Sequence, residues 1–111
     1  MAYSAAVIFT ETVVFTRQIT KLLADDDYQR LQQELLRNPA AGDLIKQSGG
    51  LRKVRWHSAS KGKRGGIRVI YYWFVSAAEI YMLLAYGKGE KDDLSAQELK
   101  ILRELVKREL T

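Results

Sequence analysis

The spacing of apolar residues changes near Gly42. Before that point it follows the 3.6-residue period of amphipathic helices, and from there to about Tyr86 the side chains alternate with period two, as in half-buried strands. A strand and a helical hairpin are therefore expected first. These expected elements are a strand at residues 3–9, a helix from Glu11 to about Leu23 capped by Thr10, and a helix that starts at Asp25–Asp27 and stops before Asn38-Pro39.

Three consecutive strands follow, and the loops between them are too short for parallel crossovers. They are expected at Leu51–Trp56, Ile67–Val75 and Ile80–Tyr86. A capping box at Ser95 and Glu98 begins the last helix, whose apolar stripe includes Leu99 and Leu102. The predicted order is β-α-α-β-β-β-α in a single domain over residues 1–111. This is an α+β fold in which an antiparallel sheet packs against the helical hairpin and the C-terminal helix.

Positive charge is concentrated in the middle of the chain. The formal net charge is +5, from 18 Lys and Arg against 13 Asp and Glu. Between Leu44 and Ala78 there are eight basic residues and no acidic ones, which leaves 10 basic and 13 acidic residues, a balance of −3, for the rest. A basic zone on a weakly acidic body is typical of a site for a polyanion, and the alternative is a solvated run of charge.

The residue inventory excludes several kinds of chemistry. The chain has no cysteine, so it has no disulfide, thiolate metal site or thiol nucleophile, and its single histidine, His57, excludes a His-rich metal site. We therefore expect no metal and no cofactor. The N-terminus lacks a basic signal-peptide region, and the uncharged run Val69–Ala78 is only ten residues long. We expect a cytoplasmic protein with no membrane span.

Five charged residues are the candidates for a catalytic site. Lys53 and Arg55 lie two apart on an expected strand, so both side chains leave the same face. Arg68 lies on the neighbouring strand among apolar residues, where it must snorkel, pair or point into a cleft. Lys88 and Glu90 follow the third strand, which adjoins the second. RNA cleavage fits such a set because RNA supplies its own nucleophile, and the protein needs only proton transfer and cations around the phosphate.

Three segments carry a combined motif: Ser48–Trp56 (SGGLRKVRW), Gly62–Tyr72 (GKRGGIRVIYY) and Tyr81–Ser95 (YMLLAYGKGEKDDLS). In this order and spacing they resemble the RelE superfamily of type II toxin–antitoxin toxins, and within it the HigB-type toxins. The resemblance implies a ribosome-dependent mRNA interferase, an endoribonuclease that cleaves A-site codons through the 2′-hydroxyl without a metal and so inhibits translation. The implied partners are the ribosome with its rRNA, mRNA, and a HigA-type antitoxin whose helix-turn-helix domain carries any contact with operator DNA.

The same motifs imply catalytic roles for Lys53, Arg55, Arg68 and Lys88, with Arg68 as the clamp on the phosphate. The implied substrate-binding residues are Lys61, Lys63 and Arg64 for ribosomal RNA, one of Tyr86, Trp56 and His57 for base stacking, and Glu90. Histidine is a common acid or base in catalysis, and both a catalytic role and an inert exposed position stay open for His57.

Two other function classes stay open from the sequence. A toxin of the gyrase-poisoning ParE branch shares the fold and acts by binding, and a basic nucleic-acid-binding module acts without chemistry. The Lys53 and Arg55 pair and the Lys88–Glu90 ending favour the RNA-cleaving branch. The antitoxin has two candidate binding surfaces, the edge strand at residues 3–9 and the basic face of the sheet.

Overall fold

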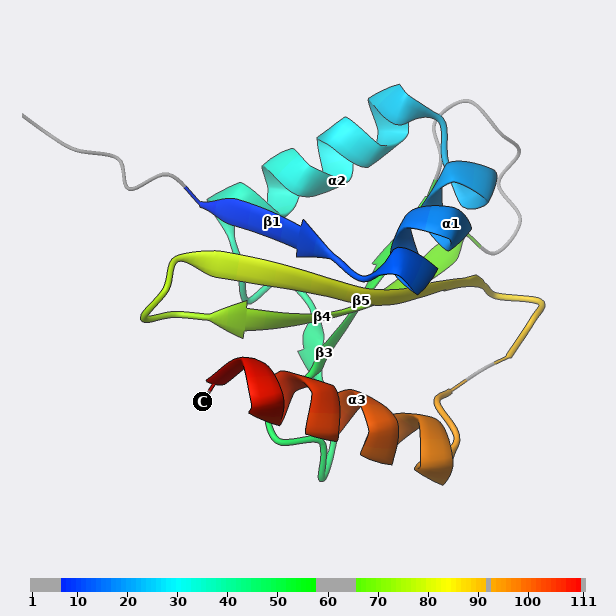
Figure 1. Cartoon of the computed structure of the whole chain (residues 1–111). Helices are drawn as coiled ribbons and strands as arrows, with labels where there is room; N and C mark the ends of the chain where they lie inside the picture. The colour runs from blue at the N-terminus through cyan, green and yellow to red at the C-terminus, as the bar shows by residue number, and fades with distance from the viewer. Residues whose placement is uncertain (1–6, 58–65, 92, 111) are drawn as a thin grey trace, which may run out of the picture.

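The computed structural model describes residues 7–57, 66–91 and 93–110. Within these ranges the chain forms an α+β fold, so the predicted fold class is confirmed. The elements are β1 (Ile8–Glu11), α1 (Val13–Leu22), α2 (Asp25–Arg37), β2 (Asp43–Leu44), β3 (Arg52–Trp56), β4 (Ile67–Phe74), β5 (Glu79–Gly87) and α3 (Ala96–Leu110). Helices α1 and α2 cover one face of the sheet, and α3 covers the other (Figure 1).

The described strands form one five-stranded sheet in the order β1-β5-β4-β3-β2. Its centre is the predicted meander, because β3, β4 and β5 pair antiparallel in sequence order. The expectation of a purely antiparallel sheet was wrong: β1 pairs with β5 in parallel, since the intervening chain supplies the long connection that a parallel pair requires. The two-residue strand β2 pairs with β3 and was not predicted, because two residues show no period.

The start of α1 also differs from its prediction. Residues 3–6 of the expected first strand lie outside the described residues, and the observed strand continues to Glu11. Thr10 pairs with β5 and donates a hydrogen bond to Glu79 Oε2 at 2.5 Å, so it cannot cap a helix. The N-cap is Thr12, whose Oγ1 accepts from the backbone N–H of Phe15 at 2.9 Å. Strand pairing therefore delays the helix by two residues relative to the local capping signal.

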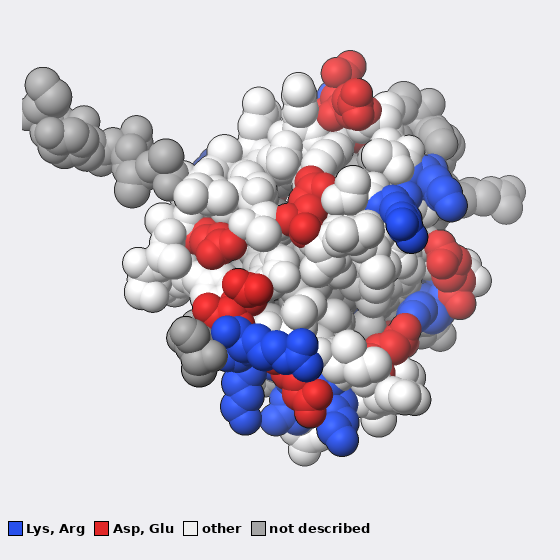
Figure 2. Space-filling model, viewed as in Figure 1, with Lys and Arg blue, Asp and Glu red and all other residues white. Residues whose placement is uncertain are grey.

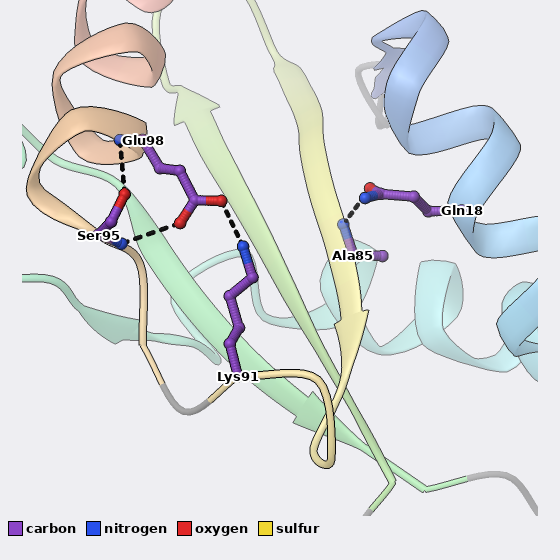
Figure 3. Close-up of polar contacts among 5 residues, drawn as sticks. All are labelled: Gln18, Ala85, Lys91, Ser95 and Glu98. Atoms are coloured by element: carbon purple, nitrogen blue, oxygen red, sulfur yellow. Dashed lines mark hydrogen bonds and ion pairs between the residues drawn. The ribbon is translucent and has the colours of Figure 1, made fainter.

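Helix α1 covers the edge of β5 beyond the end of β1. The Thr12 hydroxyl donates to the carbonyl oxygen of Leu83 at 2.9 Å. Six residues further along, Gln18 Oε1 accepts from the backbone N–H of Ala85 at 2.9 Å (Figure 3). Both side chains satisfy backbone groups that a neighbouring strand would otherwise bind, which protects this part of the sheet edge.

Two hydrophobic clusters pack on the two faces of the sheet. The cluster under α1 and α2 includes Phe15, Leu31, Val69, Tyr71 and Met82, and the cluster under α3 includes Ile70, Leu83, Leu102 and Val106. Burying one such aliphatic or aromatic side chain contributes roughly 1.5–3 kcal/mol, so both helical layers are firmly attached. No helix in the described part of the chain is long and apolar enough to cross a membrane.

A β-bulge interrupts the pairing of β4 with β5. Ile70 pairs with Leu84, but the next residue, Tyr71, pairs with Met82, so Leu83 is an extra residue in β5. The bulge shifts the alternation of side chains along the strand. As a result Tyr86, beyond the bulge, faces α3 and belongs to the cluster on that side.

Candidate functional site

Three cations from two neighbouring strands face the α3 side of the sheet. Lys53 and Arg55 alternate along β3 with residues such as Trp56, which packs under α1 and α2, so the prediction that the two cations share a face is confirmed. In the register of the sheet Arg55 lies opposite Arg68 of β4, and Arg68 lies opposite Tyr86 of β5. We call Lys53, Arg55 and Arg68 the cationic cluster.

The members of the cationic cluster differ in exposure. Arg68 is only 9% exposed, the Lys53 side chain is 20% exposed, and Arg55 lies at the surface. A buried guanidinium has few alternative rotamers and little contact with water, so Arg68 is a fixed positive charge. Arg55 can adjust its position to a ligand. The cluster therefore combines one rigid charge with more adaptable ones.

A cavity of about 380 Å³ opens beside the cluster, between β2, β3 and the beginning of α3. Its polar lining consists of Asp43, Lys46, Lys53, Arg55, Tyr86 and Asp93, and its apolar lining includes Ile70, Leu94 and Leu99. Arg68 adjoins two of these lining residues in the sheet register. A cavity that combines cations with apolar side chains suits a ligand with phosphate charge and flat apolar faces, such as a nucleotide.

Asp93 is a site residue that the sequence did not reveal. Its Oδ1 accepts a hydrogen bond from Lys53 Nζ at 2.7 Å. This hydrogen bond and the charge of Lys53 lower the pKa of the Asp93 carboxyl, and the charges of Arg55 and Arg68 lower it further. The aspartate belongs to the segment Tyr81–Ser95 that resembles RelE toxins, but it lies between two elements, where no period indicates the direction of a side chain.

Lys91 covers the ring of Tyr86. Its Nζ lies 5.3 Å from the ring centroid, and Tyr86 is only 1% exposed. Lys91 also forms an ion pair with Glu98, which belongs to the predicted capping box with Ser95, and this pair lowers the pKa of Glu98 (Figure 3). The role predicted for Tyr86 in base stacking would therefore require Lys91 to move away from the ring.

The other two stacking candidates lie outside the cavity. Trp56 packs against the cluster under α1 and α2, on the opposite face of the sheet from Lys53. Its indole N–H is buried, with no hydrogen-bond partner among the described residues. His57 is exposed directly after β3. The stacking roles of both residues stay predictions, and the position of Trp56 separates it from the cationic cluster.

Lys88 and Glu90 lie just beyond β5 and do not line the cavity. Both side chains are exposed. The backbone N–H of Lys88 donates to the carbonyl oxygen of Gly66 at 3.3 Å, and Glu90 Oε1 accepts from the backbone N–H of Gly87 at 3.0 Å. Glu90 thus closes the turn that carries Lys88. The predicted rRNA-binding residues Lys61, Lys63 and Arg64 lie outside the described residues.

A larger hollow of about 460 Å³ lies between the turn at Ser48 and the outer side of α3. Its lining includes the basic residues Lys100, Arg103 and Lys107 together with Glu104. Figure 2 shows acidic and basic atoms interleaved over α3, at the bottom of the view, so this helix does not carry charge of one sign. None of the described residues with a predicted site role lines this hollow. The candidate site is therefore the smaller cavity.

Comparison with solved structures identifies a similar fold. The structure of the Escherichia coli toxin RelE, an arginine-to-alanine double mutant in the free state, matches this chain with a TM-score of 0.51 and 14% sequence identity. The match covers 93% of this chain and 97% of that chain. The chain has the fold of a RelE toxin. No protein-family model matches the sequence. The expected RelE-like fold is thus confirmed by structure.

The described residues also bear on metal binding. Among residues 7–57, 66–91 and 93–110, no group of three or more histidine, aspartate or glutamate side chains could hold a metal ion. The acidic residues at the cavity, Asp43 and Asp93, flank a lysine, and Asp93 is hydrogen-bonded to it. The described charged side chains that line the cavity are thus three basic residues and two acidic ones.

Proposed function

We propose that this protein is the toxin of a type II toxin–antitoxin system, of the HigB-type branch of the RelE superfamily, and that it cleaves mRNA in the ribosomal A site. The observation that supports this most directly is the cationic cluster, which lies beside a ligand-sized cavity on a sheet of RelE-like fold. The segments that resemble RelE toxins contribute all three cations.

The proposed reaction uses a nucleophile that the substrate supplies. The 2′-hydroxyl oxygen forms a bond to the adjacent phosphorus, and the bond from phosphorus to the 5′-oxygen breaks. The proton of the 2′-hydroxyl passes to a base, and the leaving 5′-oxygen receives a proton. The products are a 2′,3′-cyclic phosphate and a 5′-hydroxyl, with no change of oxidation state. Negative charge builds up on the phosphoryl oxygens in the transition state, where fixed cations stabilise it most.

The site residues have distinct proposed roles. Arg68 holds the non-bridging phosphate oxygens, because its buried guanidinium is a fixed and planar donor. Arg55 and Lys53 neutralise the charge that develops during the reaction. Lys53 and Lys88 are the proposed groups for proton transfer, and Lys88 reaches the substrate from beyond the end of β5. Tyr86 lies in the cavity wall, and base stacking on its ring requires Lys91 to move aside.

The proposed partners are those that the resemblance to RelE toxins implies. The basic residues Lys61, Lys63 and Arg64 contact ribosomal RNA in a salt-dependent manner. A HigA-type antitoxin with a helix-turn-helix domain neutralises the toxin and carries any contact with operator DNA. The proposed place of action is the cytoplasm, where translating ribosomes are found.

A translation extract that receives the purified protein tests the proposal. We expect ribosome-dependent mRNA fragments with 2′,3′-cyclic phosphate and 5′-hydroxyl ends. Intact mRNA together with cleaved DNA–gyrase complexes would instead support the gyrase-poisoning branch. Intact mRNA together with harmless overexpression would support a non-catalytic binding module.

Variants of the cationic cluster sharpen this test. Loss of one preorganised charge-stabilising donor typically slows a reaction by about 10²–10³-fold, so we expect that effect for Arg68→Ala. Arg55→Ala provides a variant at an exposed position, where folding is not at risk. Arg17→Ala, on the exposed side of α1, is the matched control and should cleave like the wild type. Wild-type cleavage by the Arg68→Ala protein would remove Arg68 from the site.

A further inference from the structure

Asp93 occupies a position next to Lys53 that a phosphate group could take. The two side chains are joined at 2.7 Å from Nζ to Oδ1, although the residues lie on different segments of the chain. The Asp93 side chain is 78% exposed, whereas that of Lys53 is 20% exposed. A ligand that approaches the Lys53 ammonium from solvent therefore meets the Asp93 carboxylate first.

All three members of the cationic cluster act on this carboxylate. Lys53 lowers the pKa of Asp93 most, and Arg55 and Arg68 add to the effect through their charges. The carboxylate thus lies where the positive potential of the cluster converges. Carboxylate and phosphate oxygens accept the same short, charge-assisted hydrogen bonds from Lys and Arg. The position of the Asp93 carboxylate therefore marks a subsite for a phosphate oxygen.

Asp93 is not needed to hold the helix that follows it. The N-terminus of α3 is fixed by the capping box, in which the Glu98 N–H donates to Ser95 Oγ at 3.1 Å and the Ser95 N–H donates to Glu98 Oε1 at 2.9 Å. Lys91 pairs with the same glutamate (Figure 3). The Lys53–Asp93 contact adds an exposed ion pair to this arrangement, and such pairs contribute little to stability.

We propose that Asp93 is an internal competitor for the phosphate subsite on Lys53, and that it lowers the affinity for any phosphodiester that no other contact holds in place. This inference rests on the proposed function, because it takes the RNA backbone as the ligand. RNA that the ribosome already positions displaces the weak ion pair once and stays bound. Unattached RNA must compete with Asp93 at every encounter, so the aspartate favours docked substrate over unattached RNA.

The test is the binding of a fluorescent 2′-deoxy oligonucleotide, which this chemistry cannot cleave, to the full chain without ribosomes. Asp93→Asn keeps the shape of the side chain and removes its charge, and it should bind about two- to fivefold more tightly at roughly 0.05 M salt. The gain should shrink at about 0.5 M salt, where exposed charges are screened. Asp26→Asn makes the same change in net charge on the exposed start of α2, and its affinity should change by less than about 1.5-fold.

Two outcomes would overturn the inference. The first is equal affinity of the Asp93→Asn and Asp26→Asn proteins. The second is an equal gain in Asp93→Glu, which keeps the competing charge and should bind like the wild type. Because this assay involves neither cleavage nor ribosomes, its result does not depend on the nuclease proposal. Absence of mRNA cleavage in the translation extract would overturn that proposal and leave the competition by Asp93 measurable.

Discussion

The hydroxyl of Tyr71 joins the central strand β4 to the segment that leads into β2. It accepts a hydrogen bond from the backbone N–H of Gly42 at 2.9 Å and donates one to the carbonyl oxygen of Pro39 at 2.7 Å. Tyr71 and Gly42 are both buried. Replacing Tyr71 by Phe removes one oxygen atom and deprives both backbone groups of this partner. We expect the change to lower stability and to loosen the cavity wall that Asp43 contributes.

The size of the effect follows from the two bonds. Leaving a buried N–H without an acceptor costs about 1–3 kcal/mol, and the bond to the less buried carbonyl adds about 1 kcal/mol. We therefore expect the free energy of unfolding to fall by about 2–4 kcal/mol. For a chain of 111 residues the melting temperature moves by roughly 4 °C per kcal/mol, which gives a decrease of roughly 8–16 °C.

Urea unfolding followed by circular dichroism measures this difference, and calorimetry checks the melting temperature. The matched control is Tyr72→Phe, on the other face of the same strand. Tyr72 is half-buried, and its hydroxyl makes no hydrogen bond with the described residues, so its loss should cost less than about 0.5 kcal/mol. A decrease for Tyr71→Phe no larger than that for Tyr72→Phe would refute the reasoning.

Three further changes test other contacts. Thr12→Ala removes the N-cap of α1 and its bond to β5, and should lower the free energy of unfolding by about 1–2 kcal/mol in urea. The Lys91 hydrogen bond holds the pKa of Glu98 below its usual 4.5, so the stability from ionised Glu98 is present above that pH and lost as the pH falls through the lower folded value. Glu98→Gln should accordingly flatten the acid limb of the stability profile. Burial and the hydrogen bond to Glu11 raise the pKa of Tyr28 above its usual 10.0. The stability that the neutral Tyr28 hydroxyl contributes is therefore fully present below pH 10 and is lost as the pH rises further. Tyr28→Phe should weaken this alkaline loss of stability in denaturation measured from pH 9 to 11.

Local patterns predicted the elements that depend on local interactions. The meander and α3 were placed correctly, because alternation along β4 and the capping box at Ser95 are contained in short segments. The prediction of Thr10 as the N-cap was wrong because the deciding contact is distant in the sequence. Either threonine suits a cap, and pairing of Thr10 with distant β5 decides between them. Contacts far apart in sequence also explain why the parallel pairing of β1 and the two-residue strand β2 were missed.

The candidate site likewise contains residues whose placement follows from local sequence patterns and residues whose placement does not. The shared face of Lys53 and Arg55 follows from a two-residue spacing, and the antiparallel meander then brings Arg68 beside them. Asp93 lies in an irregular segment, 40 positions from Lys53, so nothing in its local sequence indicates this contact. Tyr86 could not be assigned to a face by alternation, because the bulge changes the phase of β5.

The extra residue at Leu83 means that β5 has one residue more than its partner strand requires. Both halves of β5 keep their pairing with β4, and the bulge takes up the difference between them. Deleting Leu83 should therefore make the ladder regular and leave Tyr86 opposite Arg68, with the loss of one core side chain. β4 has no extra residue of this kind. Removing Ile70 would turn either Arg68 or Tyr71 to the opposite face of the sheet from the one it now occupies. The site thus tolerates a change of length in one of its central strands and not in the other.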